Sequence, residues 1–475
     1  MTTAPLQTVT ASIAEASCRP SLAGLAADGS ATQNGSARNR AIDLYRAVAM
    51  LMVAFGHWLA ISVFVDDTGT LQAGNALDLA PQFAPISWLM QVMPLFFVVG
   101  GFASAASLDA HRRNVTATDA DWLSARLRRL YTPVAVLAAT WFGLIVVGTM
   151  VGVGGLAVLA AGAAAIPLWF IANYTIDTAI APKTLPAFRA NPARFAGFLV
   201  GAIVSLEVLR FIDLGVFNPI SHLNWVLGWL GFQVAGFAWK DGLIRPGRFL
   251  AMAGAVVLGA AIVLVTVGPY PVSMVHFDGI GSLSPTHPPS LALMLFGTGY
   301  SALAIAAAPA VNRLIDRQPG LWKATIAANS MAMSVYLWHF TAAVIAGGVF
   351  YALGILPTAI TGSTAWWIQK IPLILASTVV LAGVVALVSR FERAALFAKR
   401  AASAYSYRFL LTLSLMLSFA VKGLWTSRTP VGIIVGTAFV ALSFIAVLWQ
   451  PHRPSLNSIS SAWLQRVRRS TIIST

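Results

Sequence analysis

The chain has 475 residues, of which 58% are hydrophobic and only 10% are charged. An ordinary soluble domain has about 25% charged residues, so this chain cannot cover a water-facing surface of its size and must be solvated by lipid. The net charge is +15. The basic residues lie in short segments between apolar runs, which excludes a nucleic-acid-binding domain and indicates membrane orientation signals.

The N-terminal residues 1–37 are rich in Ala, Ser, Thr and Gly and contain no long apolar run. We expect a disordered cytoplasmic tail and not a signal peptide, because no basic start leads into an apolar stretch. The only cysteine, Cys18, lies in this tail. A disulfide framework and a thiolate metal cage are therefore excluded, and the low-complexity surroundings argue against a nucleophilic cysteine.

Apolar runs of membrane-spanning length follow the tail. Their short polar gaps and their apolarity on all sides favour helices over a β-barrel. We therefore predict an all-α, polytopic transmembrane helical bundle of about 12 spans. The predicted spans are 41–63, 84–107, 130–150, 154–174, 196–213, 222–239, 249–267, 290–309, 325–349, 367–389, 408–426 and 430–449.

The distribution of basic residues gives this map an orientation. With both termini in the cytoplasm, 27 of the 31 Lys and Arg residues fall in cytoplasmic segments or at the cytoplasmic end of the first span. Only Arg210, Lys370, Lys422 and Arg428 fall near the outer side. This bias is typical of a multi-pass protein whose N- and C-termini are cytoplasmic.

The first predicted span carries an arginine and a histidine on one face. Arg46 and His57 are eleven residues apart, which is about 20° around a helix and a rise of about 16 Å. Arg46 is then near the cytoplasmic surface, and His57 is past mid-membrane. A snorkelling arginine with a hydrogen-bonded core histidine is one interpretation; a site for an anionic ligand that reaches inward is the other. Asp43 and Trp58 flank the pair as candidate site-lining residues.

The next two segments contain further candidates. Phe97 precedes the pair Gly100 and Gly101 in the second span, and paired glycines usually allow helices to approach closely. Arg126 and Arg129 lie in the following cytoplasmic segment. They are either ordinary positive-inside charge or a clamp for phosphate, which arginine suits.

The ninth predicted span contains Tyr336-Leu337-Trp338-His339. His339 is again a lone histidine in an apolar run, for which a structural role in the core is the ordinary interpretation. Tyr336 and His339 are also candidate site-lining residues.

Together these segments resemble the acyltransferase 3 family of bacterial membrane O-acyltransferases. That family has Arg, ten residues and His in its first helix, a phenylalanine-rich second helix, Arg-X-X-Arg in the next cytoplasmic loop and a late Tyr-Leu-Trp-His-like segment. The matching residues are Arg46 with His57, Phe96–Phe102, Arg126 with Arg129, and Tyr336–His339. Gly100 stands where the family usually has serine. Trp169-Phe170 and the run Gly268–Met274 look like features of actinobacterial members.

The resemblance covers about residues 38–395 and implies a membrane acyltransferase domain of about ten spans. Residues 396–450 would add two transmembrane helices, and residues 451–475 a basic cytoplasmic tail. No functional interpretation follows for the two added helices.

The resemblance also implies an activity and its partners. A bacterial plasma-membrane enzyme of this family transfers an acyl group, other than an aminoacyl group, from cytoplasmic acyl-CoA to a hydroxyl of a carbohydrate or lipid-linked acceptor. O-acetylation in the cell envelope is an example. By that resemblance His57 would be the general base, and Arg46, Arg126 and Arg129 would bind acyl-CoA. Acyl-CoA is then a co-substrate, and no metal is expected.

Two alternatives stay open. A bundle of this size with intramembrane His and Arg is also typical of a proton-coupled secondary transporter of a small polar solute or lipid, although the two halves show no convincing self-similarity. A metal site formed by His276, Asp278 and His287 lacks helical i,i+4 spacing and is disfavoured.

Overall fold

The computed structural model describes residues 39–65, 71–212, 218–275, 285–286, 288–396 and 405–426. The predicted tails at 1–37 and 451–475, the span at 430–449 and Cys18 lie outside the described residues, as do His276, Asp278 and His287.

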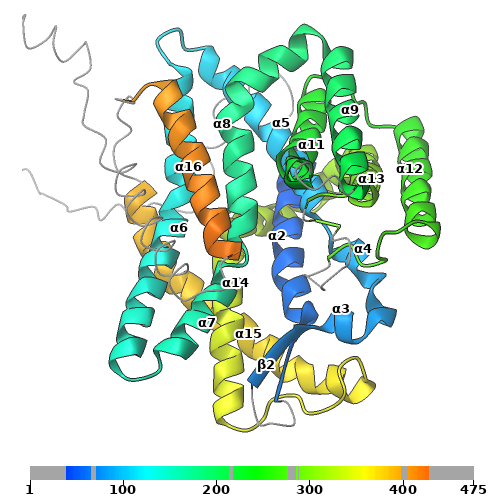
Figure 1. The fold of residues 1–475 in the computed structure, drawn as a ribbon. Coiled ribbons are helices and arrows are strands. Elements are labelled where there is room, and N and C mark those ends of the chain that lie inside the picture. Colours follow the sequence, from blue (N-terminus) through cyan, green and yellow to red (C-terminus); the bar gives the residue numbers. More distant parts are fainter. Residues whose placement is uncertain are drawn as a thin grey trace, which may run out of the picture. The chain divides into compact units, whose positions relative to one another are not determined.

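The described part of the chain is helical apart from one short hairpin (Figure 1), which confirms the prediction of an all-α polytopic membrane protein. The helices from the N-terminal side are α2 (Arg40–Ala60), α3 (Ala76–Leu79), the 3-10 helix η1 (Pro81–Phe83), α4 (Ile86–Met90), α5 (Met93–Arg112), α6 (Asp119–Met150), α7 (Gly154–Ala165), α8 (Leu168–Ala190) and α9 (Pro192–Phe211). They continue with α10 (Asn218–Ser221), α11 (Asn224–Lys240), α12 (Arg248–Val267), α13 (Leu291–Arg317), α14 (Pro319–Ala352), α15 (Thr364–Leu396) and α16 (Tyr407–Thr426).

Eight of the described helices are long and apolar enough to cross a membrane, and a ninth span results if the bent pair α7–α8 counts as one. Helix α11, predicted as a span at 222–239, has 17 residues. The total of about 12 spans and the cytoplasmic position of both termini stay predictions.

Several predicted spans differ from the observed helices. The span predicted at 130–150 is part of α6, which begins at Asp119, so Arg126 and Arg129 lie within this helix and not in a loop before it. The first predicted span was expected to reach residue 63, but α2 ends at Ala60 and the chain enters strand β1 (Ile61–Val65), which pairs antiparallel with β2 (Leu71–Asn75). The run Ile-Ser-Val-Phe-Val is rich in residues that favour strands. The span predicted at 154–174 is instead broken between α7 and α8, with a bend of 43°. Pro167, which lacks a backbone N–H, lies at the break.

Close packing of α5 against α11 explains the paired glycines of the second predicted span. A Cβ at Gly101 would overlap the backbone carbonyl of Gln233, and one at Gly236 would overlap that of Val98. Side chains at these positions would force the two helices apart, so Gly101 serves close helix packing.

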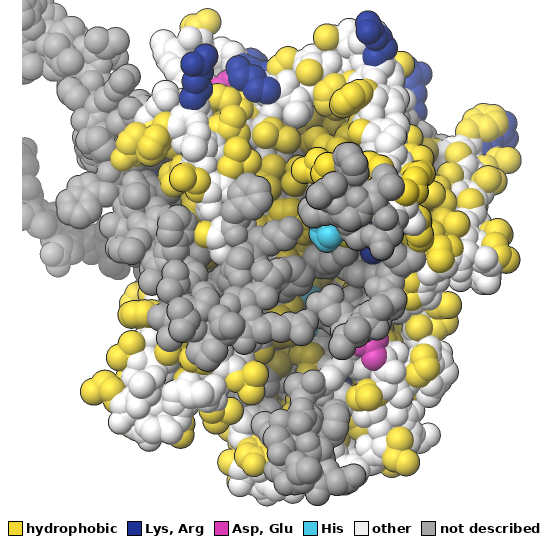
Figure 2. Space-filling model, viewed as in Figure 1, with side chains coloured by type: hydrophobic (Ala, Val, Ile, Leu, Met, Phe, Trp, Pro, Cys, Tyr) yellow, Lys and Arg dark blue, Asp and Glu magenta, His cyan; other side chains and the backbone are white. Residues whose placement is uncertain are grey.

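The surface also has the features of a membrane protein. Figure 2 shows hydrophobic side chains over much of the visible face, while most visible Lys and Arg side chains lie toward its upper edge. On α12, Met252 is 63% exposed and Val256 is 73% exposed. Such apolar exposure suits contact with lipid.

A charged cluster joins the ends of three helices. Arg189 on α8 bonds Asp109 on α5, with Nη1 2.8 Å from Oδ1, and Asp241 after α11, with Nε 2.7 Å from Oδ2. Lys240 contacts both carboxylates. The hydrogen bonds from Arg189 hold the pKa of the Asp241 carboxyl below its usual value. All four residues lie in or beside segments that the charge bias assigns to the cytoplasm.

Candidate functional site

Helix α2 presents Arg46 and His57 to the same neighbour, as their spacing predicted. Nε of Arg46 donates to Oδ1 of Asn329, 3.2 Å away, and Nδ1 of His57 lies 3.0 Å from Nε2 of His339. Asn329 and His339 both belong to α14. The α2–α14 contact therefore holds the arginine near one end of the site and the histidine toward the other.

The two histidines form a pair, which the sequence did not predict. Their rings are nearly parallel, with centroids 5.1 Å apart and an interplanar angle of 22°. His339 is fully buried. Its backbone carbonyl accepts a hydrogen bond from Nε1 of Trp58 at 2.9 Å, and the hydroxyl of Tyr336 donates to the carbonyl of Pro167 at 2.7 Å. Trp58 and Tyr336 therefore tie the pair to α2 and to the α7–α8 break.

The hydrogen-bond chain determines where the protons lie when both rings are neutral. Nδ1 of His339 bonds the carbonyl oxygen of Tyr336, which can only accept, so this nitrogen carries the hydrogen. Nε2 of His339 then has a lone pair. If the hydrogen between the rings belongs to Nδ1 of His57, Nε2 of His57 is the nitrogen able to take a proton.

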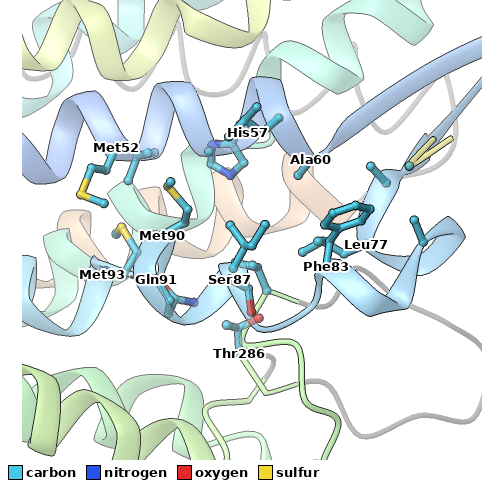
Figure 3. A pocket seen from close by; sticks show the side chains of 18 of the residues that line it. Met52, His57, Ala60, Leu77, Phe83, Ser87, Met90, Gln91, Met93 and Thr286 are labelled. Carbon is cyan, nitrogen blue, oxygen red and sulfur yellow. Dashed lines mark hydrogen bonds between the residues drawn. The ribbon is translucent and has the colours of Figure 1, made fainter. Parts of the chain in front are cut away.

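A pocket adjoins His57 and extends along α2 from Met52 to Ala60. Figure 3 shows the imidazole projecting from α2 into a space with Met90 on one side and Leu77 and Phe83 on the other. Further walls come from Trp169 and Tyr336, from Val275 and Thr286 beyond α12, and from the start of α15. These segments are far apart in the sequence, so only the fold assembles the pocket.

Lys370 fixes the end of α2 that carries His57. Its Nζ donates to the carbonyl of Leu59 at 2.8 Å and also contacts that of Ile61. It lies 4.2 Å from the ring centroid of Trp366, and the residue is only 2% exposed. A cation that bonds terminal carbonyls stabilises a helix C-terminus. Lys370 is one of the four basic residues predicted near the outer side, and this contact gives it a structural role. The sequence alone indicated no function for it.

Arg46, Arg126 and Arg129 gather near one another, because Arg126 interacts electrostatically with both of the others. Arg126 also contacts the hydroxyl of Ser107 and lies 5.3 Å from the ring centroid of Trp122. The three arginines predicted to bind one ligand therefore lie near one another, although they come from α2 and α6.

The remaining predicted site-lining residues have different surroundings. The backbone carbonyl of Asp43 accepts a hydrogen bond from Asn329, 2.7 Å away. Phe97 is buried and stacks on Trp229, with ring centroids 4.8 Å apart. Neither residue lines the pocket around His57, and nor does Gly101.

The structure gives a physical account of Gly100. A Cβ there would come 2.8 Å from Cε2 of Tyr174 and 3.5 Å from its hydroxyl oxygen, so the tyrosine ring occupies the space that a serine side chain would need. Tyr174 also interacts electrostatically with Arg126. The Tyr174 hydroxyl is therefore near Gly100 and within electrostatic range of Arg126.

The described residues contain no group of three or more His, Cys, Asp or Glu side chains arranged to hold a metal ion.

Comparison with known proteins gives one match. The family model of the acyltransferase domain, type 3, matches residues 39–388, a range that includes Arg46, the arginines of α6 and both histidines. No curated protein and no solved structure matches the chain.

Proposed function

The chain belongs to the acyltransferase 3 family and is thus a multi-pass membrane acyltransferase. On this basis we propose that it transfers an acyl group from cytoplasmic acyl-CoA to a hydroxyl of a carbohydrate or lipid-linked acceptor. The sequence resemblance to this family is confirmed, and it favours an enzyme over the transporter alternative. The observation that carries the proposal is that His57, on the same helix as Arg46, lines a pocket and contacts the buried His339.

The donor head binds at the arginine group. The phosphates of coenzyme A are highly anionic, and Arg46, Arg126 and Arg129 supply cations from two helices to one region. Arg46 and His57 are separated by a rise of about 16 Å along α2, which the extended arm of the coenzyme can bridge. The thioester would then lie at the imidazole while the phosphates stay at the arginines.

The reaction needs a base within hydrogen-bond reach of the acceptor hydroxyl. The hydroxyl oxygen attacks the thioester carbonyl as its proton passes to Nε2 of His57. The tetrahedral intermediate then collapses, the carbon–sulfur bond breaks, and the proton on His57 passes to the leaving thiolate. His339 holds the His57 ring through Nδ1 and stabilises the imidazolium by accepting that hydrogen bond.

Residues 38–395 are then the catalytic domain, which acts in a bacterial plasma membrane. Helix α16, at the start of the added segment 396–450, packs against α8, and Tyr407 donates to the carbonyl of Ala179 at 2.6 Å. The added segment therefore packs on α8, the helix that begins at the α7–α8 break and carries Arg189 near its other end.

Substitution of the base tests the proposal. Purified His57→Ala should bind acyl-CoA like the wild type but transfer the acyl group about 10²- to 10⁴-fold more slowly. His222→Ala is the matched control, since this exposed histidine lies outside the pocket. Near wild-type transfer by His57→Ala would exclude the mechanism. Loss of donor binding in the same variant would make His57 a binding residue instead.

A further inference from the structure

The pocket beside His57 has an apolar lining. Among the residues that the structure describes, no Asp, Glu, Lys or Arg lines it. The lining includes sulfur-containing and aromatic side chains: Met52, Met90, Met93, Phe83, Trp366 and Trp367. Flexible methionines and flat aromatic rings fit irregular hydrophobic groups.

The polar side chains in the lining are already used by the protein. Ser87 donates to the carbonyl of Ala84 at 2.5 Å, and its oxygen accepts from the backbone N–H of Met274 at 2.8 Å. Gln91 donates to the carbonyl of Met274 at 2.9 Å. These bonds fix the segment after α12 as one wall of the pocket. The Tyr336 hydroxyl is likewise bonded to a backbone carbonyl.

We propose that this pocket binds the acceptor through a hydrophobic body, so that the acceptor is a long-chain or polycyclic alcohol and not a bare sugar. The inference rests on the proposed function, because it assigns the substrate class of the same site. A sugar would lose water from several hydroxyls and find few partners in this lining. An alcohol with an apolar body needs one polar contact, at His57, and gains from burial of the remainder.

The position of the pocket assigns it to the acceptor and not to the acyl chain of the donor. The donor head is expected at Arg46, Arg126 and Arg129, whereas the pocket extends from Met52 in the middle of α2 to the opposite end of that helix and beyond it. Its walls include the hairpin-side segment 76–91, the segment after α12 and residues 362–367. The charge bias places all of these on the outer side. The acceptor therefore enters from the side opposite the coenzyme.

The experiment compares two probes on the purified full-length protein in detergent. Quenching of tryptophan fluorescence measures binding of 1-decanol and of methyl glucoside, since Trp169, Trp366 and Trp367 line the pocket. Release of free CoA from acetyl-CoA measures transfer to each probe. Met90→Gln makes the lining polar, and Leu89→Gln is the matched control, because Leu89 lies on the same short helix, is 58% exposed and is outside the pocket.

We expect decanol to bind at least about tenfold more tightly than methyl glucoside, and Met90→Gln to weaken decanol binding about tenfold. Leu89→Gln should leave it unchanged. Equal or tighter binding of methyl glucoside, or equal effects of the two variants, would overturn the assignment. Fluorescence changes caused by decanoyl-CoA but not by decanol would also overturn the assignment, because the pocket would then bind the acyl chain of the donor. Saturable decanol binding without CoA release would support the pocket assignment and contradict the proposed function.

Discussion

The two ends of α2 hold their functional side chains in different ways. Near Arg46, cations from α2 and α6 gather in one region and interact over distance. Near His57, the imidazole is fixed by a hydrogen bond to a fully buried partner and by packed apolar walls. Coulombic attraction falls slowly with distance, whereas proton transfer needs hydrogen-bond reach. We therefore expect changes at the arginine end to alter donor binding, and changes at the histidine end to alter the rate of transfer.

The charge bias predicts that the two ends of α2 lie on opposite sides of the membrane. In a background in which Cys18 is replaced by serine, Val115→Cys and Ile360→Cys place single thiols in loops at the predicted inner and outer sides. Both positions are open, with Val115 98% and Ile360 85% exposed. In intact cells an impermeant thiol reagent should label Ile360→Cys fully and Val115→Cys only after lysis. Labelling of Val115→Cys from outside would reverse or break the orientation.

The arginine end should give the next largest effect. Each charge-assisted contact with a phosphate contributes about 1.5–3 kcal/mol, so Arg126→Ala/Arg129→Ala should weaken acyl-CoA binding about 10²- to 10⁴-fold. Transfer at saturating donor should change much less, because the base is untouched. Arg245→Ala, an exposed arginine in the loop after α11, is the matched control. Unchanged affinity in the double variant would exclude the clamp.

Much of the arginine end could be predicted from the sequence, because it follows from the spacing of residues along a helix and from the distribution of charge. The eleven-residue interval between Arg46 and His57 predicted a shared face, and both residues do contact α14. The positive-inside bias predicted a cytoplasmic position for Arg126 and Arg129 without knowledge of packing. Local patterns of this kind depend on helix geometry alone.

The histidine end depends on contacts between distant segments, which no single-sequence pattern contains. His57 and His339 are 282 residues apart, so a lone histidine in an apolar run gave no indication of its partner. Trp366 and Trp367 line the pocket, although they lie at the start of a predicted span, where aromatic residues usually anchor a helix at the membrane interface. The break at Pro167 and the strands after α2 were missed because an apolar run of the right length favours one straight helix.

The sequence suggested a structural role for His339. Its contact with His57 indicates instead that it positions the base. His339→Ala removes a hydrogen bond worth about 1–3 kcal/mol, so transfer per folded molecule should fall about 5- to 150-fold. His339→Gln can present an acceptor near the position of Nε2 and should retain more activity than the alanine variant. The pH profile of kcat/KM should also shift in His339→Ala, since the titration of His57 depends on its neighbour.

A purely structural role makes a different prediction for the same variants. Thr341→Val is the control for stability, because Thr341 is a buried polar residue on α14 that accepts a hydrogen bond from Trp141 at 3.1 Å. If His339→Ala and Thr341→Val lose the same stability and both keep the wild-type pH profile, His339 does not position the base.

The smallest effect should come from the charged cluster that ties α5, α8 and α11 together, where side chains are part-exposed. Arg189 holds the pKa of Asp241 below its usual value of about 3.9. A carboxyl whose pKa is depressed in the folded state contributes stability above its unfolded pKa, and this contribution is lost as the pH falls through the folded pKa. Asp241→Asn should therefore lower the free energy of unfolding by about 1 kcal/mol at pH 7. The difference from wild type should begin to shrink below about pH 4 and should vanish once the pH is below the depressed folded pKa of Asp241. Thermal unfolding in detergent at several pH values measures this, and Asp316→Asn, in the more exposed pair with Arg40, should give a smaller difference. An Asp241→Asn effect that persists undiminished at acid pH would show that the carboxylate charge is not what joins these helices.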